Sequence, residues 1–154
     1  MFNDLREFLN RAAEMGEVKL IEGADWESEI GALTELMSTV PNPPLLLFDK
    51  IKGYPTGYRV ASNLFTSPRR TALALGLPLE SSKMGLVRAL REKIEAGIKL
   101  LPPVEVETGP VKENIDIGDQ VDLFKFPTPR WHERDGGRYI GTGDIGITRD
   151  PDEG

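Results

Sequence analysis

The chain has 154 residues, enough for one sizeable hydrophobic core or two small ones, and its 39% hydrophobic and 29% charged residues are ordinary for a globular protein. Its formal net charge of −6, with both signs scattered along the sequence, argues against nucleic-acid binding, and the absence of cysteine excludes disulfides, thiolate metal sites and cysteine nucleophiles. No apolar stretch approaches the roughly 18 residues that a membrane span needs, so we expect a soluble, cytoplasmic protein.

The N-terminal part predicts a helix followed by a short strand. The apolar positions of the helix recur with a helical period: Leu5, Phe8, Leu9 and Ala12. Asn3 or Asp4 can cap this helix and Gly16 can end it. Val18 and Leu20 then alternate with charged neighbours, as they do in a strand.

A second helix and a buried strand come next. We expect the helix to begin at Asp25 and to end before Pro41, which cannot continue the backbone ladder. Its apolar face would be Trp26, Ile30, Leu33, Met37 and Val40. The continuous apolar run of residues 45–48 predicts a strand buried on both faces in the middle of a sheet. Residues 49–55 are typical of a turn or hairpin, and residues 58–62 of the strand that follows it.

Two further helices complete this part. Ser67 is suited to an N-cap and Pro68 to the first helical position of a helix that ends near Gly76. The second of the two ends at Gly97 and has its apolar positions at Leu86, Val87, Leu90 and Ile94. Prolines at 102 and 103 then force an extended connector, and we place a domain boundary between residues 100 and 112.

Beyond this boundary the apolar pattern changes to a period of two, which predicts the opening strands of a β-barrel or sandwich. The alternating residues are Val104, Val106, Ile115, Ile117, Val121, Leu123, Phe124, Tyr139, Ile140, Ile145 and Ile147. Gly141, Gly143 and Gly146 lie within the last of these strands. They indicate either a flat ligand against the backbone or a barrel corner, and the spacing favours neither.

The strand runs into the turn sequence at residues 150–154, which normally leads to a return strand. We therefore expect the front part of a longer protein.

Three local patterns are weak as functional motifs. The sequence Asp135-Gly136-Gly137 lacks the spacing of a phosphate-binding loop and precedes a strand, not a helix. His132 lies near carboxylates, but it is the only histidine, so loop bracing is a better interpretation than a metal site or general acid–base role. Residues 69–70 are both arginine at a helix start, where we expect them to be solvated.

Taken together, a series of segments resembles the N-terminal part of the UbiD-like reversible decarboxylases. The segments are DLREFL at 4–9, GE at 16–17, LLF at 46–48, IKGYP at 51–55, NL at 63–64, RTALALG at 70–76, VDL at 121–123 with Pro127, and DGGRYIGT at 135–142. They occur in order over essentially the whole chain, and the combination is more specific than any single segment.

The resemblance implies an α+β fold. Residues 1–105 would be an N-terminal α/β domain with a mixed sheet and about three to four helices. Residues 106–154 would supply the first strands of a split β-barrel that binds flavin, truncated here. It also implies a carboxy-lyase that uses prenylated FMN, with Mn2+ and K+ near the cofactor phosphate, to remove carboxylate from aromatic or α,β-unsaturated acids. A flavin prenyltransferase would supply the cofactor, and the full-length protein would form a homo-oligomer.

Little of the family's machinery falls on this sequence. Thr142 matches a threonine on the strand that enters the cofactor site, and Gly143 and Asp144 adjoin it, so we expect these three residues to contact the cofactor. The Glu-Arg-Glu set that handles protons and the metal ligands would lie beyond Gly154. We therefore expect no catalytic residue and no metal ligand in this segment, which alone would be inactive and retain no cofactor.

Two other functions remain open. The chain could be a stand-alone accessory module that recruits a partner through an open sheet edge. Less in keeping with its sequence, it could be a split-barrel flavin reductase that uses ordinary FMN, a comparison that rests on fold analogy alone.

Overall fold

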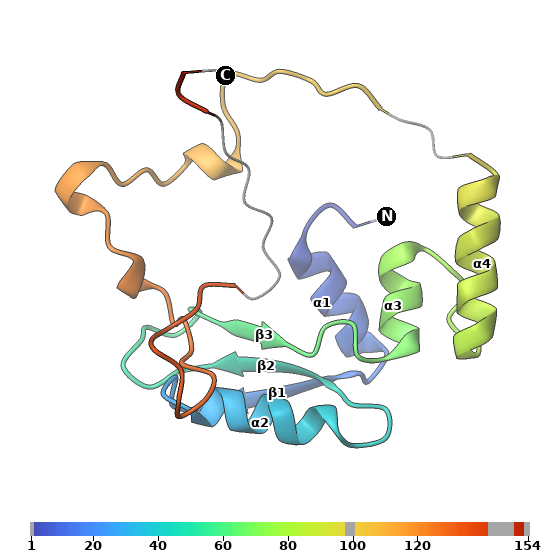
Figure 1. Cartoon of the computed structure of the whole chain (residues 1–154), viewed down its shortest axis with the longest axis horizontal. Coiled ribbons are helices and arrows are strands. Elements are labelled where there is room, and N and C mark those ends of the chain that lie inside the picture. The colour runs from blue at the N-terminus through green and yellow to red at the C-terminus, as the bar shows by residue number, and fades with distance from the viewer. Residues whose placement is uncertain (1, 98–100, 142–149, 153–154) are drawn as a thin grey trace.

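The computed structural model describes residues 2–97, 101–141 and 150–152 (Figure 1). A three-stranded sheet of order β1-β2-β3 forms its centre. Its strands are β1 (Val18–Glu22), β2 (Leu45–Asp49) and β3 (Val60–Ser62). β1 and β2 are parallel, with Val18 opposite Leu45, whereas β2 and β3 are antiparallel, with Leu47 opposite Ala61. The predicted mixed sheet and the central position of β2 are confirmed.

Four α-helices accompany the sheet in the described part of the chain: α1 (Leu5–Glu14), α2 (Glu29–Ser38), α3 (Pro68–Leu75) and α4 (Lys83–Glu95). The predicted α+β class and number of helices are confirmed. Asp4 caps α1 by accepting a 2.9 Å hydrogen bond from the Glu7 backbone N–H. Gly76 ends α3 in the left-handed conformation, with φ +62°, which an L side chain rarely adopts.

The main core lies between β2 and α2. Leu46 and Phe48 alternate onto one face of the central strand and are fully buried, and Ile30 of α2 packs with them. Leu45 is equally buried but points to the opposite face, which explains the continuous apolar run of this strand. The sheet is therefore covered on both faces at β2.

The predicted start of α2 is wrong by four residues. Asp25 does not begin the helix, which starts at Glu29 with Ser28 at its N-cap. The backbone of residues 26–28 instead pairs with Arg130, through an isolated parallel bridge between Glu27 and Arg130. A contact with a distant segment therefore replaces the local helix that the apolar spacing predicts.

The strands predicted between residues 104 and 124 are also absent from the described residues. This region holds three short 3-10 helices, η1 (Pro110–Lys112), η2 (Gly118–Gln120) and η3 (Leu123–Lys125), joined by extended chain. Its apolar side chains are exposed, Val104 by 81% and Val111 by 90%. The alternation is present, but no neighbouring strand in the described structure supplies backbone partners, and an extended segment becomes a strand only by pairing.

From residue 101 the chain runs in a wide arc and returns to the sheet, so that the orange and red segment near residues 126–140 lies beside β3 and α2 (Figure 1). Within the described residues, each helix is too short or too polar to traverse a lipid bilayer. The return segment, and what it builds next to β3, is the part of the fold that bears on function.

Candidate functional site: a cleft between β3 and the return segment

We call residues 126–140 the return segment. Its central contact is with the approach to α2: the Arg130 N–H donates to the Trp26 carbonyl at 3.1 Å, and the Ser28 N–H donates to the Arg130 carbonyl at 3.0 Å. The Arg130 guanidinium also lies 3.3 Å from a Glu27 carboxylate oxygen. This backbone pairing fixes the register of the return segment against the N-terminal part of the chain.

A glycine in α2 allows the two segments to come this close. A Cβ atom built on Gly31 would lie 1.8 Å from the Trp131 carbonyl oxygen and 2.6 Å from its carbonyl carbon. Such distances are far inside van der Waals contact, so no other residue fits at position 31 without displacement of Trp131.

The outer end of the return segment is held by Arg138. Its guanidinium carbon lies 3.4 Å from the centre of the Trp26 ring, a cation–π stack, and Nη1 donates a 2.5 Å hydrogen bond to the Tyr54 hydroxyl. The Tyr54 hydroxyl in turn donates to the Phe124 carbonyl at 3.0 Å. Arg138 thus joins three segments that are far apart in sequence.

The Asp25 carboxylate stabilises the segment that directly precedes α2. Asp25 accepts a hydrogen bond from the Glu27 backbone N–H at 2.9 Å and pairs with the Lys52 ammonium at 3.0 Å. Both interactions hold the pKa of the Asp25 carboxyl below its ordinary 3.8, the backbone hydrogen bond more than the lysine. Asp25 therefore stays ionised and fixes residues 26–28, whose backbone pairs with Arg130.

Between the return segment and β3 lies a cleft of ≈ 780 Å³. One wall is β3 with its flanking residues 59–64, the other is formed by residues 126–129 with Trp131 and His132, and Ile140 and Gly141 close one side. A volume of this size with a mainly apolar lining is ordinary for a small-molecule site.

Polar groups are concentrated on the β3 wall. The hydroxyls of Thr34 and Ser62 share a 2.8 Å hydrogen bond, and the Asn63 side-chain amide donates to the Thr34 carbonyl at 3.0 Å. Arg59 adds a cation to the lining. The opposite wall contributes Trp131, whose indole N–H is buried and has no hydrogen-bond partner among the described residues.

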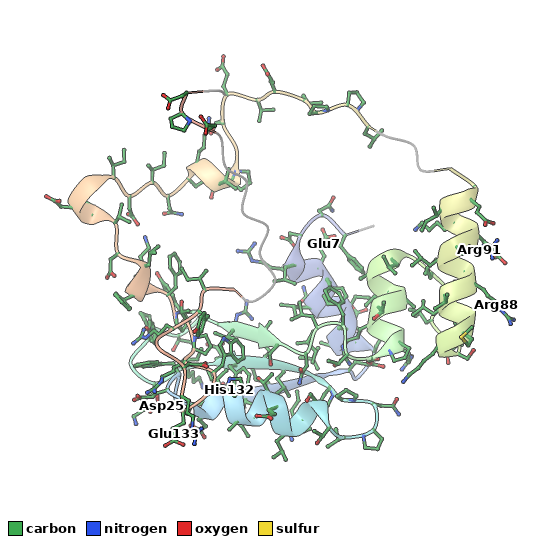
Figure 2. The ribbon with its side chains drawn as sticks, viewed as in Figure 1. Glu7, Asp25, Arg88, Arg91, His132 and Glu133 are labelled. Atoms are coloured by element: carbon green, nitrogen blue, oxygen red, sulfur yellow. The ribbon has the colours of Figure 1, made fainter. Side chains whose placement is uncertain are left out.

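His132, labelled in Figure 2, is one of the residues that line the cleft. Its side chain is 63% exposed. Its ring nitrogens are 3.8 Å from a Glu35 oxygen and 3.6 Å from an Asp135 oxygen, and its backbone N–H donates to Asp135 at 3.0 Å. No group of three metal-ligating side chains occurs in the described parts of the chain. The hydrogen bond that holds this turn therefore comes from the His132 backbone and the Asp135 carboxylate, and the His132 ring makes no hydrogen bond to the described residues.

The prediction that both arginines at the start of α3 are solvated is wrong for Arg70, which is fully buried. Its guanidinium lies 2.7 Å from the Glu17 carboxylate. Burial lowers the pKa of Arg70 while Glu17 opposes this, and a guanidinium keeps its charge in proteins. Glu17 also accepts a 2.9 Å hydrogen bond from the Ser67 hydroxyl, so Ser67 occupies the N-cap position without capping α3 through its side chain.

The three predicted cofactor contacts, Thr142, Gly143 and Asp144, lie outside the described residues, directly after Gly141 of the cleft lining. Arg130, Trp131 and Arg138, which place the return segment, received no role from the sequence. The partners that place them are 84 to 112 positions away, from Tyr54 to Trp26 as counted from Arg138, so no local pattern could have assigned them.

The described residues fit part of the cofactor that the resemblance implies. A flat, largely apolar ring system suits a cleft lined by Phe126, Trp131 and prolines. The described residues of the cleft lining include no carboxylate, so they do not fit its metal ions.

Two family models match the chain in succession. Residues 9–93 match the N-terminal domain of the 3-octaprenyl-4-hydroxybenzoate carboxy-lyases, and residues 103–154 match the Rift-related domain of the same family.

Curated relatives carry decarboxylase names. The chain is 34% identical over 158 residues to a pyrrole-2-carboxylic acid decarboxylase of Pseudomonas aeruginosa, covering 97% of this chain and 31% of the relative. It is 33% identical over 157 residues to a phenolic acid decarboxylase of Sedimentibacter hydroxybenzoicus, covering 99% of this chain and 32% of the relative. The chain thus spans about a third of the length of these relatives.

Solved structures show the same fold. The open form of the vanillic acid decarboxylase of Sedimentibacter hydroxybenzoicus superposes with a TM-score of 0.77 at 33% identity, over 90% of this chain and 29% of that one. An evolved dimeric form of the UbiD-class enzyme HmfF from Pelotomaculum thermopropionicum, in complex with prFMN, gives 0.72 at 32% identity, over 99% of this chain and 34% of that one.

Proposed function

The chain belongs to the UbiD family of 3-octaprenyl-4-hydroxybenzoate carboxy-lyases, and from this premise we propose that it is the N-terminal portion of a prenylated-FMN-dependent reversible decarboxylase. The observation that carries the proposal is the succession of two domains of that family in one chain, at residues 9–93 and 103–154. The substrate of the whole protein would be an aromatic or α,β-unsaturated carboxylic acid. The decarboxylase names of the relatives support this class of reaction.

The cleft beside β3 is our candidate for a contribution of this chain to cofactor binding. Trp131 and Phe126 offer apolar surface that excludes water, and Arg59 offers a cation that would attract an anionic ligand. When bound, the prenylated flavin supplies the electron sink that decarboxylation requires. Thr142, Gly143 and Asp144 follow the cleft lining directly in sequence and stay our predicted cofactor contacts.

The remainder of the same protein would supply the other groups. In this proposal the Glu-Arg-Glu set, the Mn2+ and K+ ligands and the oligomer contacts lie outside residues 1–154, and a flavin prenyltransferase provides the cofactor. A domain boundary at residues 105–106 and a cytoplasmic location also stay predictions. A flavin cofactor agrees with the HmfF structures that contain prFMN or FMN.

The test compares two proteins purified after co-expression with a flavin prenyltransferase: a chain of the full length of the relatives, and residues 1–154 alone. We expect flavin absorbance and CO2 release from the longer protein, assayed with pyrrole-2-carboxylate, vanillate and other aromatic acids. We expect neither from residues 1–154.

The two parts of the proposal fail separately. Flavin-loaded longer protein that releases no CO2 from any unsaturated or aromatic acid would contradict the activity. Turnover by residues 1–154 alone would contradict the division of the site between this segment and the remainder.

A further inference from the structure

Arg70 is a fully buried charge with an unusually complete set of acceptors. Nε donates to the Leu64 carbonyl at 2.9 Å and Nη1 to Glu17 Oε2 at 2.7 Å. Nη2 donates to the Pro43 carbonyl at 2.7 Å and to both the Asn63 carbonyl and the Thr66 hydroxyl at 2.9 Å. Only a guanidinium can serve acceptors arranged in this planar fork.

These acceptors belong to one end of the sheet. Glu17 directly precedes β1, Pro43 lies just before β2, and Asn63 directly follows β3. Because β3 is antiparallel to β2, its C-terminal end lies beside the N-terminal ends of β1 and β2. Arg70 therefore ties together the same end of all three strands.

The turn after β3 needs such support. Asn63 has φ +56°, a left-handed conformation that is uncommon for a residue with a side chain. Its carbonyl accepts from Arg70 and from the Thr66 hydroxyl, and its side-chain amide reaches the Thr34 carbonyl of α2. Arg70 thus holds the main chain of Asn63 in this strained conformation, and α2 holds its side chain.

The same turn is a wall of the cleft, since Ser62, Asn63 and Leu64 all line it. Arg70 itself does not line the cleft. We propose that Arg70 is a positioning residue: through the carbonyls of Asn63 and Leu64 it fixes the shape of the β3 wall of the cleft. The significance of that wall for ligand binding rests on the proposed function, whereas its shape can be tested without any ligand.

The test uses 15N relaxation of residues 1–154 with Arg70→Lys, which keeps a positive charge but cannot serve all the acceptors. We expect the backbone order parameters of residues 63–66 to fall from about 0.85 to below about 0.6, while those of β2 stay near 0.85. The Asn63 side-chain amide resonances, which report the bond to Thr34, should shift as well.

Arg69→Lys is the matched control. Arg69 also lies on α3 and pairs with Glu17 at 3.2 Å, but it makes no hydrogen bond to residues 63–66. We expect its order parameters at residues 63–66 to match those of the unaltered chain.

Thr66→Val keeps the test decisive if Arg70→Lys does not fold, because Thr66 is exposed and the substitution removes only one acceptor of Arg70 and one donor to Asn63. It should produce a smaller change confined to residues 63–66.

Order parameters in the turn that stay at their original values in the folded variants would overturn the proposal. So would changes spread evenly over the turn and β2, because they would show a general loss of stability instead of a local role. Neither result bears on decarboxylation, which is measured separately.

Discussion

The carbonyl oxygen of Trp131 occupies the space that a side chain at Gly31 would fill, 1.8 Å from the position of a Cβ atom. This contact joins α2 to the return segment and sets the depth at which Trp131 lies against the helix. It is also where helix propensity and packing oppose each other.

Gly31→Ala tests this opposition. Alanine is favoured over glycine inside a helix by about 1 kcal/mol, so the isolated helix would gain stability. We expect instead a net loss of about 1–3 kcal/mol in the free energy of unfolding, because the methyl group forces Trp131 away. Urea unfolding followed by tryptophan fluorescence measures it. Gly136→Ala, at a glycine with open space around it, should change stability by less than about 0.5 kcal/mol; equal effects of the two variants would contradict the close-contact explanation.

Arg138→Lys should release the outer end of the return segment. Lysine keeps the charge but loses the planar stack on Trp26 and the directed bond to Tyr54, and we expect a loss of about 0.5–2 kcal/mol. The near-ultraviolet circular dichroism of Trp26 should weaken at the same time. Arg134→Lys, at an exposed residue in the same loop, is the control. An unchanged tryptophan signal in Arg138→Lys would argue against the stack.

Asp25 should make stability depend on pH in the acid range. Its pKa is lowered in the folded state, so its stabilising effect is fully present above the ordinary value of 3.8 and is lost as pH falls through the lower folded value. Asp25→Asn should therefore be less stable than the unaltered chain at neutral pH, and the difference should shrink as pH falls below about 4. Melting temperatures measured across that range test this, with Asp119→Asn, at an exposed position, as the control. A difference that stays constant with pH would mean that the carboxylate charge is irrelevant.

Thr142 is the residue through which the proposed cofactor site can be examined in a protein of the relatives' full length. If its hydroxyl contacts the cofactor, Thr142→Val should weaken flavin retention roughly tenfold, the effect of losing one hydrogen bond of about 1.4 kcal/mol. The flavin-to-protein absorbance ratio after dialysis gives the result. Thr142→Ser, which keeps the hydroxyl, should retain flavin normally. Equal retention by both variants would remove Thr142 from the predicted contacts.

Much of the N-terminal fold follows from local patterns in the sequence. The helical spacing around Phe8 with its cap at Asp4, the continuous apolar run of β2, and Gly76 after α3 all lie where the pattern predicts. Each depends on interactions within a few residues, or on burial that any neighbouring element can provide.

The errors arise where a distant segment decides the local structure. Residues 26–28 before α2 stay non-helical because Arg130 pairs with them. Arg70 is buried because Glu17 and the loops before β2 and after β3 supply its acceptors. The alternation around Ile115 and Ile117 resembles a strand but has no partner among the described residues. Family resemblance indicated the class of protein, but neither it nor the pattern could show that Arg130 and Arg138 place the cleft wall.

The pairing of Glu27 with Arg130 spans 103 positions of the chain. During synthesis, the segment around Glu27 is therefore complete long before Arg130 is added. Domains fold from the N-terminus as they emerge from the ribosome, so the sheet and α2 can form before Arg130 and Trp131 have been made. The surface that the return segment will contact then forms before the return segment itself. Only the closing of one very long loop remains, and long-range pairing of this kind is intrinsically slow. Until that loop closes, Trp26 and Gly31 lack the cover of the return segment, so a nascent chain stalled before residue 130 would expose the Trp26 ring to solvent.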